Sequence, residues 1–557
     1  MRKNLLKTGL IVVLMLVLLA PLAMRLSSEQ QSLLANNAEH VVKPLIDLYA
    51  RSAANRADTP LQPMMELESI WALEDARSEA AQPLVSGMRN GSSVLGYDAA
   101  SQTFYCTIGL DFANSEWPVL ELFAQSADET APVHVVWVDD YAFDDPAAAV
   151  AEGYRYELFA YTQTEFQYFG LVFTGLPIVT LHSDAEHIRN NYVPACVSIS
   201  SADDPSFTSI AQIHRRGGGY GKYIDKRSYR IEFQKLTHTG RAKAMDVSVL
   251  GMEPDSDWLL LANASNVEVV HNYLAFDLWN RWSTGDHLFM QQHSRMVELF
   301  LGDEYLGLYQ LMQRVNVQEE ILKAGGSLAS DMVVRVISIL NTSDRPIQDN
   351  LEYLYAPGEN AQKAFRVAQD YRKINDWLDE RHSDEEFIEF VENHVDVENF
   401  ISFYLFSQIA GLTADNVLNN IYVYMLWEDG KYVFHVGPWD MDCAFFYGYF
   451  DSDPSTSYRF VQNFDPAVRM LDLNIMNCRK LLHEMYQQRC ETILSDEAVE
   501  QWISSVESTI AASGAYQREM EKWYGMPSNL YLSELLAFEK EQIALTREYF
   551  EERWPIP

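Results

Sequence analysis

The sequence predicts a mixed α+β chain of several domains, preceded by a membrane segment. Residues 8–24 contain no charged side chain and follow a basic N-terminus. Short runs of β-branched and aromatic residues, bounded by Asp, Ser, Gly or Pro, fill residues 93–181 and are typical of strands. Apolar residues at helical spacing occur in 360–412 and again in 458–553. A chain of 557 residues has room for several domains, since one domain takes roughly 100–200 residues.

The composition excludes several classes of protein. The 42 Lys and Arg residues against 79 Asp and Glu give a formal net charge of −37, which predicts no nucleic-acid partner because phosphates would be repelled. Hydrophobic residues at 48% and aromatic residues at 12% exclude intrinsic disorder as the main state. The five cysteines are widely spaced and form no CxxC pair, so neither a zinc ribbon nor a disulfide scaffold is indicated.

The N-terminal segment, residues 1–25, is predicted to be a signal anchor that spans the membrane. Arg2, Lys3 and Lys7 precede the apolar run. Basic flanks stay on the cytoplasmic side, so we expect an exported body anchored to the membrane. Two alternatives stay open: a cleaved signal peptide, which would leave a secreted protein, and a buried core helix. A polar helical stalk is expected over residues 26–65.

The rest of the chain divides into three predicted parts. Residues 66–175 form a β-rich accessory domain, whose acidic loops lack the calcium pattern D-x-[DN]-x-[DN]-G and are interpreted as a solvated face. Residues 176–450 form the domain that carries the chemistry, and residues 451–557 extend it with amphipathic helices.

A predicted hairpin lies near the end of the middle domain. The strand-like runs 421–427 and 431–437 flank a tight-turn sequence. Pairing centred on Asp429 would set Asn420 opposite Pro438 and bring several polar residues to the open end of the hairpin. These residues are Asp415, Asn419, Asn420, Asp440 and Asp442.

Oxygen ligands gathered in this way suit Mg²⁺, which takes one or two carboxylates together with substrate phosphates. Asp415 and Asn420 reproduce the D-x-x-x-x-N spacing of a kinase catalytic loop, and Asp440 follows as a second metal-binding aspartate. The alternative is an Asx-rich surface turn without a ligand, and the residues alone leave both interpretations open.

A second polar segment, residues 214–227, combines glycines with basic side chains in an otherwise acidic chain. It does not match a Walker A loop, but its backbone N–H groups and cations would attract phosphate. The alternating Tyr229, Ile231 and Phe233 predict a strand immediately after it. The alternative is a hairpin turn with solvated cations. The predicted nucleotide-binding residues are Arg216, Gly217, Gly218, Lys226 and Arg227, and Lys226 is expected to be a surface residue whose replacement leaves folding intact.

Several motifs in order resemble the spore coat protein H (CotH) kinase family over about residues 175–450. The polar segment supplies the first motif, and the carboxylates of the hairpin supply the last. The matching motifs are Arg216-Gly217, Lys226–Ile231, Trp258–Asn263, Asn272–Asp277, Val297–Tyr309, Asp415, Asn419-Asn420 and Trp439–Asp442.

This resemblance implies an atypical protein-kinase-like bilobal fold, with a β-rich N-lobe and a helical C-lobe. The implied activity is phosphate transfer from ATP, with Mg²⁺ or Mn²⁺, to Ser or Thr of a protein substrate, for which the acidic chain favours a basic partner. Lys226 would pair with the nucleotide phosphates, with Arg216 assisting, and Asp415 would orient and deprotonate the substrate hydroxyl. Asn420, Asp440 and Asp442 would hold the metal.

Three positions depart from the family pattern. Asn266 and His271 stand where the family usually has Asp and Arg, and Gln313 stands where it usually has Glu. These departures favour a rival function, a catalytically weak or inactive surface protein that acts in adhesion or in envelope or coat assembly. A glycosidase with paired carboxylates has little support, because no second Glu is placed by spacing.

Overall fold

A computed structural model of the chain describes residues 59–556. The gaps in this description are 63, 92, 110–119, 125–131, 139–145, 184–187, 218–224, 238–241, 283–291, 324, 337–350, 356–382, 413–416, 418–419 and 446–464. The predicted membrane segment, 1–25, therefore lies outside the described residues. Within those residues, none of the helices combines the length and apolar character that crossing a membrane requires.

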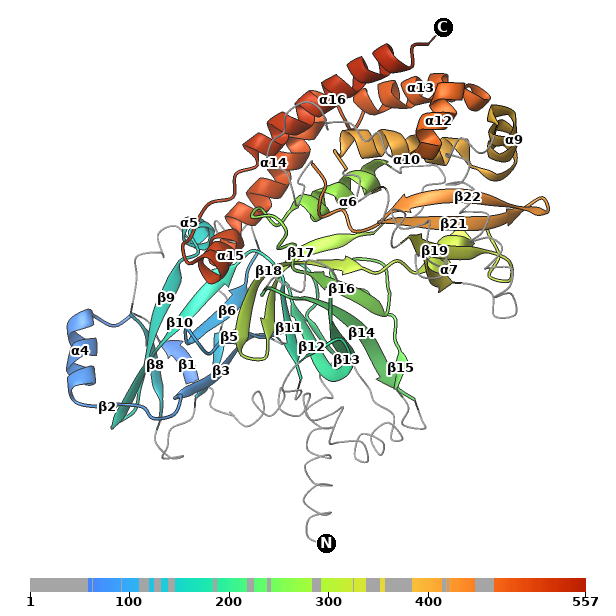
Figure 1. Cartoon of the computed structure of the whole chain (residues 1–557). Helices are drawn as coiled ribbons and strands as arrows, with labels where there is room; N and C mark the ends of the chain where they lie inside the picture. Colours follow the sequence, from blue (N-terminus) through green and yellow to red (C-terminus); the bar gives the residue numbers. More distant parts are fainter. Residues whose placement is uncertain are drawn as a thin grey trace. The chain divides into compact units, whose positions relative to one another are not determined.

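The chain separates into two compact units. Of the described residues, unit 1 comprises those up to 262 together with those in 295–313 and 507–530, and unit 2 comprises those in 263–294, 314–506 and 531–556. The chain therefore passes from one unit to the other several times along the sequence. Figure 1 shows the described helices and strands with the labels used below.

The first sheet of unit 1 has ten strands, in the order β4-β3-β7-β1-β8-β9-β10-β6-β5 with β2 beside β10. Two short helices accompany it, α4 (Leu67–Asp75) and α5 (Pro146–Ala151). Its strands are β1 (Thr59–Gln62), β2 (Ser78–Glu79), β3 (Val85–Asn90), β4 (Ser93–Val94), β5 (Gly96–Asp98), β6 (Thr103–Thr107), β7 (Leu120–Ala124), β8 (His134–Trp137), β9 (Arg155–Tyr161) and β10 (Glu165–Thr174).

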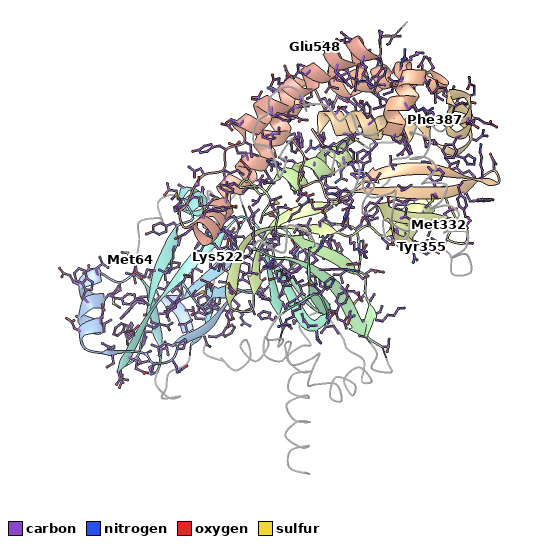
Figure 2. The ribbon with its side chains drawn as sticks, viewed as in Figure 1. Met64, Met332, Tyr355, Phe387, Lys522 and Glu548 are labelled. Atoms are coloured by element: carbon purple, nitrogen blue, oxygen red, sulfur yellow. The ribbon has the colours of Figure 1, made fainter. Side chains whose placement is uncertain are left out.

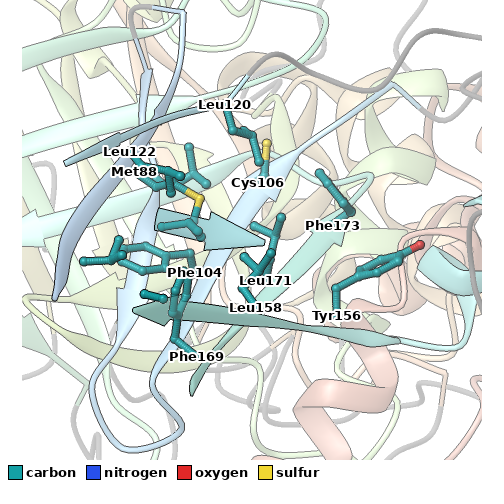
Figure 3. Close-up of a cluster of buried hydrophobic side chains, with 14 of the residues drawn as sticks. Met88, Phe104, Cys106, Leu120, Leu122, Tyr156, Leu158, Phe169, Leu171 and Phe173 are labelled. Atoms are coloured by element: carbon teal, nitrogen blue, oxygen red, sulfur yellow. The ribbon is translucent and has the colours of Figure 1, made fainter. Parts of the chain in front are cut away.

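The side chains of this sheet bury one large apolar cluster, part of which Figure 3 shows. Phe104 and Phe169 meet edge to face with their ring centres 5.9 Å apart, and Tyr156 meets Phe173 in the same way at 5.7 Å. These rings come from neighbouring strands, so their packing stabilises the association of β6, β9 and β10. Burial of this apolar surface is the main stabilising term for the sheet.

The second sheet of unit 1 has eight strands, in the order β13-β12-β11-β17-β18-β16-β14-β15. An additional pairing of β13 with β14 closes all of these strands except β15 into a ring. The strands are β11 (Ile178–His182), β12 (Val193–Ser200), β13 (Phe207–Arg216), β14 (Ser228–Leu236), β15 (Ala242–Ala244), β16 (Asp257–Leu261), β17 (Ser294–Leu301) and β18 (Glu304–Gln313). Helix α15 (Ala515–Tyr524) contacts β18.

Unit 2 contains a four-stranded sheet, in the order β20-β19-β21-β22, and most of the described helices. Helices α9 and α10 contact β22, and α10 also packs against α13 and α16 (Figure 1). The elements are α6 (His271–Trp282), α7 (Val317–Lys323), β19 (Met332–Val336), β20 (Leu351–Tyr355), α9 (Asp384–His394), α10 (Val397–Ile409), β21 (Ile421–Glu428), β22 (Lys431–Pro438), α12 (Asp465–Leu473), η6 (Ile475–Asn477), α13 (Cys478–Cys490), α14 (Asp496–Ala512), which begins in unit 2, and α16 (Ser533–Arg553).

The mixed α+β class is confirmed, and so are the strands over 93–181 and the helices in the described parts of 360–412 and 458–553. One boundary differs. Residues 59–62, within the predicted helical stalk, form β1, because β7 and β8 flank this segment and pair with its backbone groups. All five cysteines are described, and no disulfide joins any two of them.

Candidate functional site

The predicted hairpin is present in unit 2 as β21 and β22. Asp429 and Gly430 form its two-residue turn with φ angles of 47° and 87°, the left-handed conformations that tight hairpin turns require. The predicted register is wrong by one residue, since Ile421 and not Asn420 lies opposite Pro438. A two-residue turn centres the pairing between Asp429 and Gly430, whereas the prediction centred it on Asp429.

The predicted metal-binding residues flank the open end of this hairpin. The backbone N–H of Trp439 donates to the carbonyl of Asn420 at 2.9 Å, which extends the pairing beyond the strands. Asp440 is exposed and Asp442 is half-buried, while Met441 between them is fully buried. The structure therefore brings Asn420 together with the segment that carries both aspartates. Asp415 and Gly218 lie outside the described residues, so their predicted roles stay predictions.

Helix α6 contacts the aspartate segment through its first two residues, a contact that the sequence did not reveal. Asn272 Oδ1 accepts a hydrogen bond from the Met441 backbone N–H at 2.9 Å, and His271 Nδ1 lies 3.2 Å from the Ala444 carbonyl oxygen. Burial lowers the pKa of His271, partly offset by the nearby Glu268 carboxylate. The two residues stand in the motif Asn272–Asp277, but its apolar pattern predicts only a helix.

Among the three departures from the family pattern, Asn266 is the one with no compensating contact. Its side chain is buried, and neither its oxygen nor its nitrogen has a hydrogen-bond partner among the described residues. Val269, three residues later, has a φ of 54°, which is rare for a β-branched residue. The loop before α6 therefore combines a strained backbone at Val269 with a buried polar side chain at Asn266.

In unit 1, the predicted nucleotide-binding residues meet at one end of the β13–β14 pair. Arg216 lies opposite Ser228, so the chain leaves β13 beside the point where it enters β14. Gly217 has a φ of 107°, a conformation that favours glycine. Lys226 and Arg227 directly precede β14. The structure thus brings four of the five predicted residues to one end of the pair.

Lys226 is not a surface residue, which corrects the expectation that its replacement would leave folding intact. Its side chain turns inward, and the residue is only 5% exposed. The ammonium donates to Glu519 Oε1 and to the Leu308 carbonyl, both at 2.6 Å, and lies 4.7 Å from the centre of the Tyr309 ring. Burial lowers the pKa of Lys226, and the Glu519 carboxylate opposes this shift.

Helix α15 supplies Glu519, and both oxygens of its carboxylate accept hydrogen bonds. Its other oxygen, Oε2, accepts from the Leu308 backbone N–H at 2.7 Å. Gly307 has a φ of 94°, and a Cβ atom at this position would collide with Glu519 Oε2, so only glycine fits there. Burial raises the pKa of Glu519, while Lys226 acts in the opposite direction. Residues 306–308, the Leu-Gly-Leu of the family-like motif Val297–Tyr309, thus form the place where Glu519 of α15 packs.

The residue before Glu519 makes a second buried ion pair in unit 1. Arg518 donates from Nε and Nη2 to the two oxygens of Glu298, each at 2.9 Å, and the Tyr305 hydroxyl also donates to Glu298. Exposed Lys522, labelled in Figure 2, adds a contact of 3.2 Å to Glu304. Adjacent opposite charges in an amphipathic helix are usually solvated, so no sequence signal could have identified Arg518 and Glu519 as buried partners.

Position 313 does not provide the partner of Lys226. Gln313 stands at the end of β18 and donates from Nε2 to the Glu253 carbonyl at 2.6 Å. Because the carboxylate on Lys226 comes from Glu519, the departure at Gln313 leaves the lysine paired.

The polar side chains at the hairpin end are of the chemical type that suits a Mg²⁺ ion. Two carboxylates, Asp440 and Asp442, and the amide of Asn420 are oxygen ligands of the kind that Mg²⁺ binds with substrate phosphates. Across the described parts of the chain, no group of three or more His, Cys, Asp or Glu side chains could hold a metal ion by itself. A resident all-protein metal cage is therefore not the arrangement found in these parts.

The chain is thus a mixed α+β protein with an acidic hairpin end in one unit and a buried lysine–glutamate pair in the other. The family model described as CotH kinase protein matches residues 213–553, which is more than half of the chain. The chain belongs to the CotH kinase family, as its motifs indicated. The match begins in β13 and ends with α16, so the C-terminal helices are part of the family region. No curated protein matches the chain.

Proposed function

We propose that the chain is an ATP- and Mg²⁺-dependent protein kinase of the CotH type, with a kinase-like bilobal arrangement, that phosphorylates Ser or Thr of a basic protein substrate. The observation that carries the proposal is the hairpin end, where Asn420 and the Asp440–Asp442 segment meet in a member of a kinase family. The Lys226–Glu519 contact supports it, because a lysine–glutamate pair is required for catalysis in protein kinases.

Each residue has a distinct proposed role. Asp415 would accept the proton of the substrate hydroxyl as its oxygen attacks the γ-phosphorus and the bond to the β-phosphate oxygen breaks, which releases ADP. Asn420, Asp440 and Asp442 would hold Mg²⁺, or Mn²⁺, which neutralises negative charge on the phosphates. Lys226, Arg216 and Arg227, with the backbone of Gly217 and Gly218, would bind the phosphates.

Two aspartate variants test these roles in the full chain, solubilised in detergent. Asp440→Ala should abolish Mg²⁺-dependent ATP binding as well as phosphate transfer. Asp415→Asn should leave Mg²⁺–ATP binding nearly intact and slow transfer by about 10²–10⁴-fold, the usual contribution of a positioned general base. Calorimetry with Mg²⁺ and ATP measures binding, and labelled ATP with basic Ser-rich peptides measures transfer.

The matched control is Asp429→Asn, which removes a carboxylate at the opposite end of the same hairpin and keeps a residue that tolerates a positive φ. It should change neither binding nor transfer. The kinase proposal fails if wild type binds no Mg²⁺–ATP, or if Asp440→Ala binds it as well as wild type does.

A second candidate is a catalytically weak or inactive kinase-fold surface protein that acts in adhesion or in envelope or coat assembly. One observation favours it: the Lys226 ammonium already has two acceptors and an aromatic face, so a phosphate oxygen would have to replace one of them. Binding of Mg²⁺–ATP without phosphate transfer to any peptide would support this candidate.

The proposed location is a membrane-anchored, exported body, or a secreted protein if the N-terminal segment is cleaved. The support is the uncharged run 8–24 behind Arg2, Lys3 and Lys7.

A further inference from the structure

The segment that carries the two predicted metal-binding aspartates belongs to no strand or helix, yet its backbone is held in unusual conformations. Asp440 has a φ of 51° and Phe445 a φ of 60°. Left-handed conformations are unfavourable for residues other than glycine, less so for Asp and Asn, and persist where the surrounding structure holds them. The contacts that hold this segment therefore decide where its carboxylates point.

Asn272 holds the middle of the segment. Its Oδ1 accepts the Met441 N–H at 2.9 Å, and both residues are buried, with Asn272 2% exposed and Met441 0% exposed. Asp440 and Asp442 are the two chain neighbours of Met441. Fixing the amide between them therefore restricts the backbone positions of both aspartates at once.

Helix α6, which carries Asn272, is itself held in place by contacts along its length. His271 meets the Ala444 carbonyl oxygen at 3.2 Å, so α6 contacts the segment at two points. Further along α6, Trp282 donates to Ser402 on α10 at 3.1 Å, and most side chains of α6 are buried. A buried helix fixed at its far end keeps the Asn272 oxygen in place.

We propose that Asn272 is a positioning residue for Asp440 and Asp442, which acts through the Met441 backbone amide. The inference rests on the proposed function, because it assigns to Asn272 the alignment of the metal-binding carboxylates. Only a side chain with an acceptor oxygen can do this at position 272. Residues that orient metal ligands typically change metal affinity by about 10–100-fold when they are replaced.

Two substitutions separate positioning from simple stability. Asn272→Leu has a similar shape and no acceptor, so it should weaken the binding of Mn²⁺, measured by calorimetry with a non-hydrolysable ATP analogue, by at least about tenfold. Asn272→Asp keeps the acceptor and should bind Mn²⁺ within about threefold of wild type. In transfer assays, Asn272→Leu should need about tenfold more Mg²⁺ for half-maximal rate and recover its maximal rate at saturation.

Asn399 provides the matched control. It is also a buried asparagine, on α10, and it exchanges two hydrogen bonds with the backbone of Val436 in β22, at 2.7 and 3.1 Å. Asn399→Leu should lower the melting temperature at least as much as Asn272→Leu does and leave the Mn²⁺ affinity unchanged. Should Asn272→Leu not fold, Asn272→Ala replaces it with the same expected loss of affinity.

The outcomes are distinct. If wild type binds Mn²⁺ with the nucleotide and the folded Asn272→Leu or Asn272→Ala chain binds it equally well, the inference is overturned while the proposed function stands. Equal losses in Asn272→Leu and Asn399→Leu also overturn it, because the effect would then be general destabilisation. If wild type binds no Mn²⁺ with the nucleotide, the proposed function fails and the inference fails with it.

Discussion

Lys226 and Glu519 are opposite charges in a part of unit 1 from which water is excluded. Each group is penalised by burial, which lowers the pKa of Lys226 and raises the pKa of Glu519, so each depends on the other to stay charged. Removing one partner of a buried pair leaves an uncompensated charge, whereas removing both together is much less costly. This difference gives a direct test of the pair.

Lys226→Met should destabilise the folded chain by about 3–5 kcal/mol, because the Glu519 carboxylate keeps its burial and loses its cation. The double variant Lys226→Met/Glu519→Gln should recover part of this loss, since neither remaining side chain carries a charge. Unfolding in denaturant, followed through the transition that reports unit 1, measures the free energy of unfolding of both variants.

The control for this pair lies on the same helix. Lys522→Met removes the solvent-exposed contact with Glu304, and exposed pairs contribute only about 0–1 kcal/mol. If Lys226→Met is no more destabilising than Lys522→Met, the buried ion pair does not stabilise the packing of α15 in the way that its contacts indicate.

At the scale of elements, the long helix α16 carries an unusual carboxyl group. Glu539 is fully buried in unit 2, and neither of its oxygens has a hydrogen-bond partner among the described residues. Burial alone raises the pKa of Glu539 well above its ordinary value. A raised pKa in the folded state means that the folded chain holds this proton at pH values where the unfolded chain has released it.

The stability that this proton confers is complete below the unfolded pKa, about 4.3 for Glu, and is lost as pH rises through the folded pKa of Glu539. Glu539→Gln is neutral at every pH, so it should flatten this decline and raise the melting temperature of unit 2 near pH 8. The expected rise is a few degrees, because 1 kcal/mol shifts the melting temperature of a domain of this size by about 2–4 °C. Thermal unfolding at pH 5, 6.5 and 8 measures it.

Exposed Glu541, on the same helix, is the control, and Glu541→Gln should leave the pH profile of wild type unchanged. Identical slopes for wild type and Glu539→Gln would show that Glu539 does not titrate in the expected way.

At the scale of the whole molecule, the proposed export of the body can be tested directly. The proposed anchor, 1–25, has its basic residues before the apolar run, and this order predicts an exported body. Protease added to intact cells should therefore digest the chain after about residue 30. A cytoplasmic protein followed in the same samples must stay intact as the control. A body that is fully protected until the cells are lysed would overturn the proposed topology.

The sequence by itself predicted the class of each element where the pattern is local. Alternating Tyr229, Ile231 and Phe233 predicted β14, and the Asp429-Gly430 turn predicted the hairpin of β21 and β22. Side-chain periodicity and turn conformation depend on neighbours in the chain, so a sequence exposes them directly. The ordered motifs also predicted the family. The exact register escaped prediction, because a slip of one residue depends on which residues occupy the turn.

Only the tertiary structure decided the partners of the polar residues. The sequence predicted Lys226 as a phosphate-binding surface residue, whereas its burial depends on Glu519, which lies 293 residues further along the chain. Asn272 read as one residue of an apolar helix, and its role depends on the amide of Met441, 169 residues away. No local pattern encodes such pairs, because a charge in an amphipathic segment faces water unless a distant part of the fold covers it.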